Sequence, residues 1–209
     1  MKFVLNIKQV LALKDKVFKV LTEQISVTEF EEWLYNSEEL LSQIESNTFA
    51  FDAISINYKS NEWNSKLNTL LKEYQCDELL EIITIRKACV AILISETFED
   101  TYELLKISTR NFDYDTEYTI LCEFYSFRNY FGLVEEGFWK IGVLEVELKL
   151  YAKQIVELIN EYQNFERVKE ALKLDLKPYK IEKNNAAELD KTHLKTTLKQ
   201  KLFAFFKKS

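Results

Sequence analysis

The sequence predicts an all-α protein, an irregular multi-helix bundle with short helices in its N-terminal part and longer ones in its C-terminal part. The chain of 209 residues holds only 3 glycines and 1 proline, too few for the many tight turns of β-sandwiches, barrels and glycine-rich nucleotide-binding folds. Its apolar residues recur mostly at three- and four-residue spacing, which is typical of helices with one buried face. Hydrophobic residues make up 47% of the chain, so we expect a substantial core rather than general disorder.

The first 75 residues are expected to form a module of short helices. Residues 3–23 carry apolar side chains at helical spacing, with charged residues opposite them. Ser26 and Glu29 stand in the S-x-x-E order of a capping box, in which the serine accepts a backbone hydrogen bond and the glutamate reaches back. Ser37 and Asn61 are the expected N-caps of two further helices.

Residues 79–95 form the most ambiguous segment. Their isoleucine and valine content favours a strand, because β-branched side chains fit a pleated surface. Their length without a turn signal favours a helix that is apolar on nearly all sides and is interrupted by Arg86 and Lys87. We predict a buried central helix, and an α+β fold is the alternative if this segment is a strand.

Longer helices are expected in the second half of the chain, over residues 96–108, 115–130 and 134–162. Gly137 and Gly142 are expected inside the last of these helices, and Gly132 in the turn before it. Pro178 ends the regular pattern. The predicted organisation is an N-terminal helical module over 1–75, a central helical bundle packed on it over 76–176, and a linker with a basic amphipathic helix over 177–209.

Charge is unevenly distributed along the chain. Residues 1–166 hold 16 basic and 29 acidic side chains, a net charge of −13, whereas residues 167–209 hold 12 basic and 5 acidic ones, a net charge of +7. An acidic body attracts cations and repels the phosphates of nucleic acids. We therefore expect a basic protein partner and no stable nucleic-acid complex.

Residue types suited to catalysis are scarce. His193 is the only histidine, and the glycine-rich phosphate loops, the HExxH zinc pattern and the GxSxG nucleophile motif are absent. Cys76, Cys89 and Cys122 lack the paired spacing of a zinc or redox site and lie in apolar segments, where free thiols are typical core residues. We predict a protein that is not an enzyme, uses no cofactor or metal, and resides in the reducing cytoplasm.

One acidic cluster is a candidate partner-binding site. Its carboxylates have the spacing that places side chains on one face of a helix, and they belong to Glu96, Glu99, Asp100 and Glu103. We expect this face to receive a cationic partner. A divalent cation bound by the same carboxylates is the alternative.

A run of aromatic residues over 124–131 is the second candidate. It holds more rings than one helix face can bury, so some must pack inside while others remain accessible as anchors for a partner. We assign Tyr125 and Tyr130 to partner binding.

The C-terminal segment is basic and amphipathic. Docking against the acidic body of the chain is its expected arrangement, and the alternative is contact with an anionic membrane or another polyanion. The residues assigned to such a contact are Lys195, Lys199, Lys201, Phe203, Phe206, Lys207 and Lys208.

A resemblance to a known group of proteins lies in the N-terminal module. Residues 30–36 read FEEWLYN, residues 54–59 read ISINYK, and a helix with Leu70 and Leu71 follows. In this order they resemble small helical proteins encoded beside bacterial polymorphic toxins, which are taken as immunity proteins. The resemblance covers roughly residues 1–75 and implies a cytoplasmic bacterial protein that binds and blocks a cognate toxin.

The function expected from these observations is a non-enzymatic protein-binding module, an immunity protein that neutralises a basic toxin. The alternative is an adaptor or regulatory component, for example in phage defence, whose basic C-terminal segment contacts a membrane or another polyanion.

Overall fold

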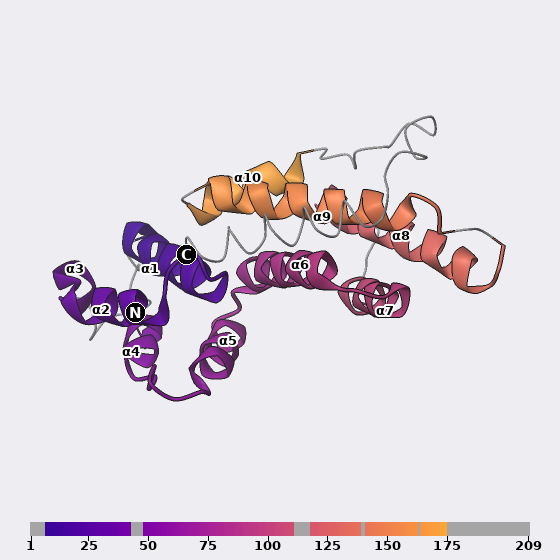
Figure 1. Ribbon diagram of the computed structural model, residues 1–209. Helices are drawn as coiled ribbons and strands as arrows, with labels where there is room; N and C mark the ends of the chain where they lie inside the picture. Colours follow the sequence, from indigo (N-terminus) through magenta and orange to yellow (C-terminus); the bar gives the residue numbers. More distant parts are fainter. Residues whose placement is uncertain (1–6, 43–47, 111–117, 139–140, 163, 175–209) are drawn as a thin grey trace. The chain divides into compact units, whose positions relative to one another are not determined.

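The computed structural model describes residues 7–42, 48–110, 118–138, 141–162 and 164–174. All regular secondary structure in these ranges is helical (Figure 1), which confirms the predicted fold class. The helices are α1 Ile7–Leu21, α2 Val27–Asn36, α3 Glu38–Leu41, α4 Thr48–Ile54, α5 Trp63–Glu73, α6 Asp77–Ile94, α7 Phe98–Ser108, α8 Thr119–Glu135, α9 Leu144–Glu161 and α10 Phe165–Lys173. None of them is both long and apolar enough to cross a lipid bilayer.

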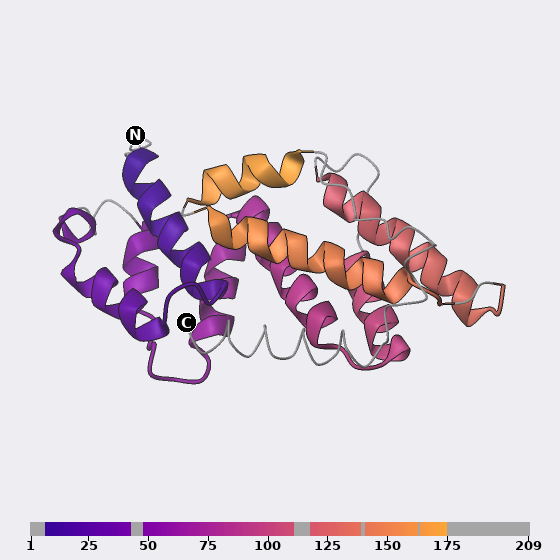
Figure 2. The ribbon, with the colours of Figure 1, turned by 45° about the horizontal axis from the view of Figure 1, so that its top comes forward.

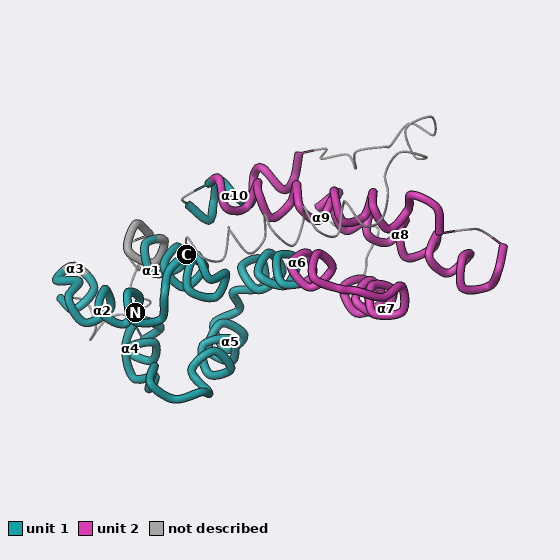
Figure 3. Tube along the Cα trace, viewed as in Figure 1, with its two compact units in different colours: residues 1–87, 162–169 teal, residues 88–161, 170–209 magenta. Residues whose placement is uncertain are grey.

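The chain divides into two compact units (Figure 3). Unit 1 comprises residues 1–87 and 162–169, and unit 2 comprises residues 88–161 and 170–209. Two of the boundaries fall inside helices α6 and α10, and the third follows the last residue of α9.

The capping box predicted at the start of α2 is present in unit 1. The Ser26 hydroxyl accepts a hydrogen bond of 3.1 Å from the backbone N–H of Glu29, and the backbone N–H of Ser26 donates to the Glu29 carboxylate at 2.7 Å. The hydrogen bond from the Ser26 backbone N–H lowers the pKa of the Glu29 carboxyl group, because it stabilises the ionised form. Ser37 caps α3 as predicted, since its hydroxyl accepts from the backbone of Leu40.

Aromatic rings hold the short helices of unit 1 together. The Tyr58 ring meets Phe30 edge-on with centroids 5.4 Å apart, and it also contacts Trp63 at 6.3 Å. The Tyr58 hydroxyl donates to the carbonyl of Ala53 at 2.7 Å, which satisfies it in a site where burial raises its pKa. Trp33 packs on Phe30 at 6.3 Å, so both quoted sequence motifs contribute rings to this core.

Unit 1 also contains a contact between distant parts of the sequence. The carboxylate of Asp15 in α1 accepts a 2.8 Å hydrogen bond from the backbone N–H of Phe165, at the start of α10. Beside it the rings of Phe18 and Phe165 lie 5.7 Å apart. Lys169 pairs with Glu78 of α6 at 3.1 Å. The first turns of α10 are thereby fixed to α1 and α6.

The ambiguous segment 79–95 lies within α6, so the predicted helix is confirmed there and the strand alternative is wrong. Apolar side chains are buried around about half of its circumference, including Ile82, Cys89 and Ile92. Arg86 is buried with them, whereas Lys87 is exposed.

The glycine predictions in unit 2 are wrong. No helix runs from residue 134 to 162, because α8 continues to Glu135 and α9 begins at Leu144. Gly137 and Gly142 have φ of +78° and +47° between these helices, in the left-handed region that glycine tolerates best. Gly132 lies inside α8, where a Cβ atom would approach the Tyr102 hydroxyl to 3.1 Å. A close helix contact therefore explains this glycine better than a turn.

The predicted cap at Asn61 is also wrong. Helix α5 begins at Trp63 with Glu62 as its N-cap residue, and no side chain accepts a capping hydrogen bond there. Residues 57–61 instead form turns, in which Asn57 accepts hydrogen bonds from Lys59 and Ser60.

The core of unit 2 forms where α8 packs against α7 and α9 (Figures 1 and 2). Phe131 of α8 is fully buried and stacks on Phe98 of α7 with centroids 5.0 Å apart and planes only 7° from parallel. Earlier in α8, the buried Phe124 meets Tyr151 of α9 edge-on at 5.9 Å. The first pair of rings positions α7 against α8, and the second positions α9 against α8.

Candidate protein-interaction face on α7

A hydrogen-bond network fixes the beginning of α7. The Thr97 hydroxyl caps the helix by accepting from the backbone N–H of Asp100 at 3.0 Å. The buried Thr101 shares a 2.7 Å hydrogen bond with the Ser95 hydroxyl. From α9, the Lys149 ammonium donates to the Ser95 carbonyl at 2.9 Å. The corner between α6 and α7 is therefore held from both sides.

Three of the four predicted carboxylates share the exposed face of α7. Glu99, Asp100 and Glu103 are exposed, and the first two lie in the first helical turn, where negative charge complements the positive end of the helix dipole. Glu96 does not share this face, because it precedes the N-cap Thr97 and lies in the connection from α6. The prediction of a four-carboxylate helix face is wrong for Glu96, since helical spacing has meaning only within the helix.

The three carboxylates on this face differ in whether a nearby cation neutralises their charge. Glu103 forms an ion pair with Lys106, and this contact raises the pKa of the Lys106 ammonium. The same ammonium lies 4.5 Å from the centroid of the Tyr102 ring. Within the described ranges, Glu99 and Asp100 have no ion-pair partner. Their charges are therefore the ones available to an approaching cation.

An apolar side chain that sequence reasoning missed lies on the same face. Ile107 is 69% exposed and follows Glu103 by one helical turn. The buried side of α7, with Thr101 and Leu105, points away from it. The sequence signal for it was an apolar residue outside the buried stripe, one helical turn after Glu103.

The two tyrosines predicted as anchors lie on different sides of α8. Tyr125 is half-buried, and its ring lies 5.8 Å from the guanidinium of Arg128, which donates to Thr109 at 3.3 Å. Tyr130 is exposed. A separation of five residues turns a helix by about 140°, so the two rings do not form one patch. The buried rings of the run are Phe124, Phe127 and Phe131.

The described side chains show no arrangement for metal chemistry. No group of three or more His, Cys, Asp or Glu side chains within the described ranges is placed to hold a metal ion. Cys76 and Cys89 are buried, and burial raises the pKa of the Cys76 thiol, which disfavours its reactive thiolate. The α7 face therefore offers charge and apolar surface rather than a coordination site.

The C-terminal residues assigned to a polyanion or membrane contact lie outside the described residues. They are Lys195, Lys199, Lys201, Phe203, Phe206, Lys207 and Lys208. His193 lies outside them as well.

Comparison of the chain with protein-family models, with curated proteins and with solved structures finds no match in any of the three.

Proposed function

We propose that this chain is a non-enzymatic binding module, an immunity protein that neutralises a basic toxin and receives it on the exposed face of α7. The observation that carries the proposal is that the exposed, unpaired Glu99 and Asp100 share one face of α7 with the exposed Ile107, which lies two helical turns further along. Carboxylates alone are common on solvated helices, and Ile107 adds one exposed apolar side chain to this face for a partner to bury.

The two kinds of side chain would act at different stages of binding. The negative body of residues 1–166, with a net charge of −13 from 16 basic and 29 acidic side chains, would steer a cationic partner during diffusion. Glu99 and Asp100 would set the local orientation, and burial of Ile107 would slow dissociation. This division predicts that charge changes act mainly on the association rate.

The test is a kinetic binding experiment with the polypeptide encoded next to this chain as the probe. Charge reversal by Glu99→Lys and Asp100→Lys should lower the association rate about 10-fold at low ionic strength, and less at high ionic strength. The dissociation rate should change little, because both carboxylates are exposed.

The matched control reverses two other exposed charges of unit 2, Glu161→Lys at the end of α9 and Glu170→Lys on α10. It changes the net charge of the protein equally but leaves the α7 face intact. If both double variants slow association equally, only net charge acts and the α7 face has no special role. If the probe does not bind the unaltered chain, the immunity proposal itself fails.

A further inference from the structure

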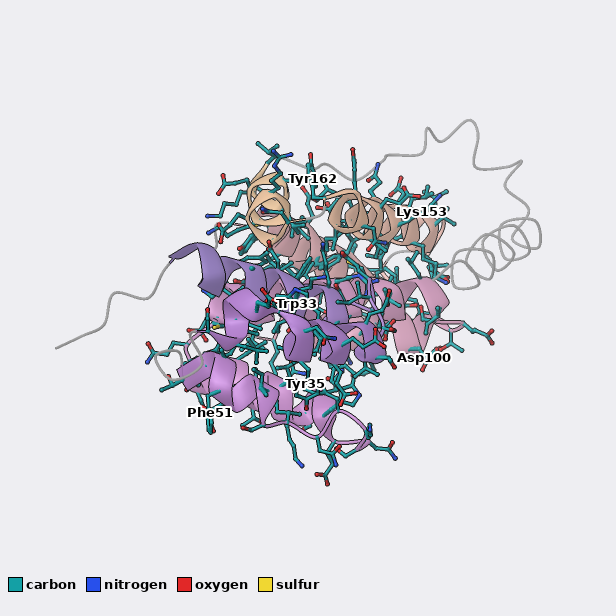
Figure 4. All side chains as sticks on the ribbon, turned by 90° about the vertical axis from the view of Figure 1, so that its left-hand side faces the viewer. Trp33, Tyr35, Phe51, Asp100, Lys153 and Tyr162 are labelled. Atoms are coloured by element: carbon teal, nitrogen blue, oxygen red, sulfur yellow. The ribbon has the colours of Figure 1, made fainter. Side chains whose placement is uncertain are left out.

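A second surface lies in unit 1, on α2 and α4, and it combines exposed aromatic rings with acidic side chains of α2. Tyr35 of α2 is 47% exposed and Phe51 of α4 is 56% exposed. In Figure 4, Trp33 lies near the middle of the view and Tyr35 and Phe51 lie below it. These two rings are absent from the aromatic core of the unit, which uses Phe30, Trp33 and Tyr58.

The Tyr35 ring is held in position although it is exposed. Its hydroxyl donates to the carbonyl of Ile54, at the end of α4, over 3.5 Å. Phe51 precedes Ile54 by one helical turn, so the α4 end that receives the hydroxyl also carries the second ring. A ring already held in place loses little conformational entropy on binding, which favours it as an anchor.

The sequence segment that carries these rings holds charges of one sign. Residues 26–58 contain no lysine or arginine, and their seven acidic residues are Glu29, Glu31, Glu32, Glu38, Glu39, Glu45 and Asp52. Glu31 and Glu32 precede Tyr35 by four and three positions, which places them next to it on α2. A nearby cation, Lys16 of α1, lies 5.5 Å from the Trp33 ring, which is on the opposite side of α2 from Tyr35.

This pattern selects among the surfaces that could cover the rings. A second copy would bring the same acidic patch against itself in a twofold contact, and the like charges would repel. An anionic membrane or a nucleic acid would be repelled in the same way. A cationic protein surface satisfies both features, because lysine or arginine can pair with Glu31 and Glu32 and also pack over the Tyr35 ring.

We propose that the α2–α4 surface, with Tyr35 and Phe51 as anchors and Glu31 and Glu32 beside them, docks a basic protein segment that presents an apolar side chain. The inference rests on the proposed function in one respect, since it names a second contact for the same class of partner. It concerns a different unit and different residues.

The probe is a synthetic amphipathic helical peptide with lysines on one face and leucine and phenylalanine on the other, titrated into the full chain. Two reference peptides replace either all lysines by glutamate or all apolar residues by serine, and neither should bind. The double substitution Tyr35→Ser and Phe51→Ser should weaken binding of the probe about 30-fold or more. Because both rings are exposed, these variants should keep the thermal stability of the parent.

Phe138→Ser is the matched control, since it removes an exposed aromatic ring that follows α8 in unit 2 and belongs to neither proposed surface. It should leave the affinity for the peptide within about twofold, as surface substitutions away from a contact usually do. Glu31→Gln with Glu32→Gln should weaken binding more at low than at high salt. Amide shifts in a nuclear magnetic resonance titration should map to α2 and α4.

Four results would overturn the inference. They are absence of peptide binding, equal affinity for the Tyr35→Ser and Phe51→Ser variant, loss of affinity with Phe138→Ser instead, and a large gain in affinity when residues 184–209 are deleted. The last would assign the surface to the basic segment of the chain itself. If the peptide test fails but the polypeptide encoded next to this chain still binds, the proposed function stands. The kinetic test of that function uses a different probe and the Glu99 and Asp100 variants.

Discussion

Replacement of Lys149 by methionine is expected to loosen the corner that positions α7. The Lys149 side chain is only 13% exposed, and its ammonium bridges the Ser95 carbonyl and the Glu145 carboxylate, both at 2.9 Å. Methionine preserves most of the apolar stem but removes both contacts. The Ser95 carbonyl follows the C-terminal end of α6. The positive charge of Lys149 interacts favourably there with the negative end of the helix dipole.

The expected loss in the free energy of unfolding is about 2 kcal/mol. A hydrogen bond from a charged donor contributes about 1.5–3 kcal/mol, and a partly exposed ion pair adds up to about 1 kcal/mol. The apolar methionine side chain recovers part of this sum by packing against the corner. Because the corner carries Thr97, the N-cap of α7, binding to the α7 face should weaken as well.

Urea unfolding monitored by circular dichroism measures the stability change, with Lys153→Met as the matched control on the same helix. Lys153 is 39% exposed and pairs with Glu157 over 3.4 Å, so its replacement should cost about 0.5 kcal/mol or less. Equal losses for the two variants would refute the reasoning, since they would show that the hydrogen bond to Ser95 does not stabilise the fold.

Three further outcomes are expected. Burial raises the pKa of Asp15 above its ordinary value of 3.8. The contribution of Asp15 to the free energy of unfolding is therefore greatest below pH 3.8 and is lost as the pH rises through the raised pKa. In urea titrations, Asp15→Asn should remove this pH dependence, while the asparagine amide oxygen still accepts the hydrogen bond from Phe165. Gly137→Ala should lower the free energy of unfolding by about 1 kcal/mol, because φ is +78° in open space, and an unchanged melting temperature would contradict the strain argument. Deletion of residues 184–209 tests the adaptor alternative: that alternative predicts liposome or nucleic-acid binding that disappears with the segment, whereas our account predicts none in either form.

Local signals predicted much of the fold. The capping box of Ser26 and Glu29 and the cap at Ser37 depend on nearest neighbours, which the sequence contains in full. The helix over 79–95 was predictable because no turn residue interrupts it. Gly132, Gly137 and Gly142 were misplaced for a different reason. A glycine that permits a positive φ and a glycine that permits close approach of a tyrosine look alike until tertiary contacts are known.

The candidate surfaces were predicted less completely. The acidic residues of α7 were identified from their spacing, but the start of the helix at Phe98 excluded Glu96. The exposure of Ile107, Tyr35 and Phe51 depends on which neighbours cover each helix face, and periodicity alone does not contain this information.

Hydrogen exchange of the full chain, with and without the polypeptide encoded next to it, tests the central claim most directly. Our account predicts that binding slows amide exchange in α7, Phe98–Ser108, while α9 retains its own exchange rates. Protection that leaves α7 unchanged in a stable complex would contradict the assignment of the partner to this face.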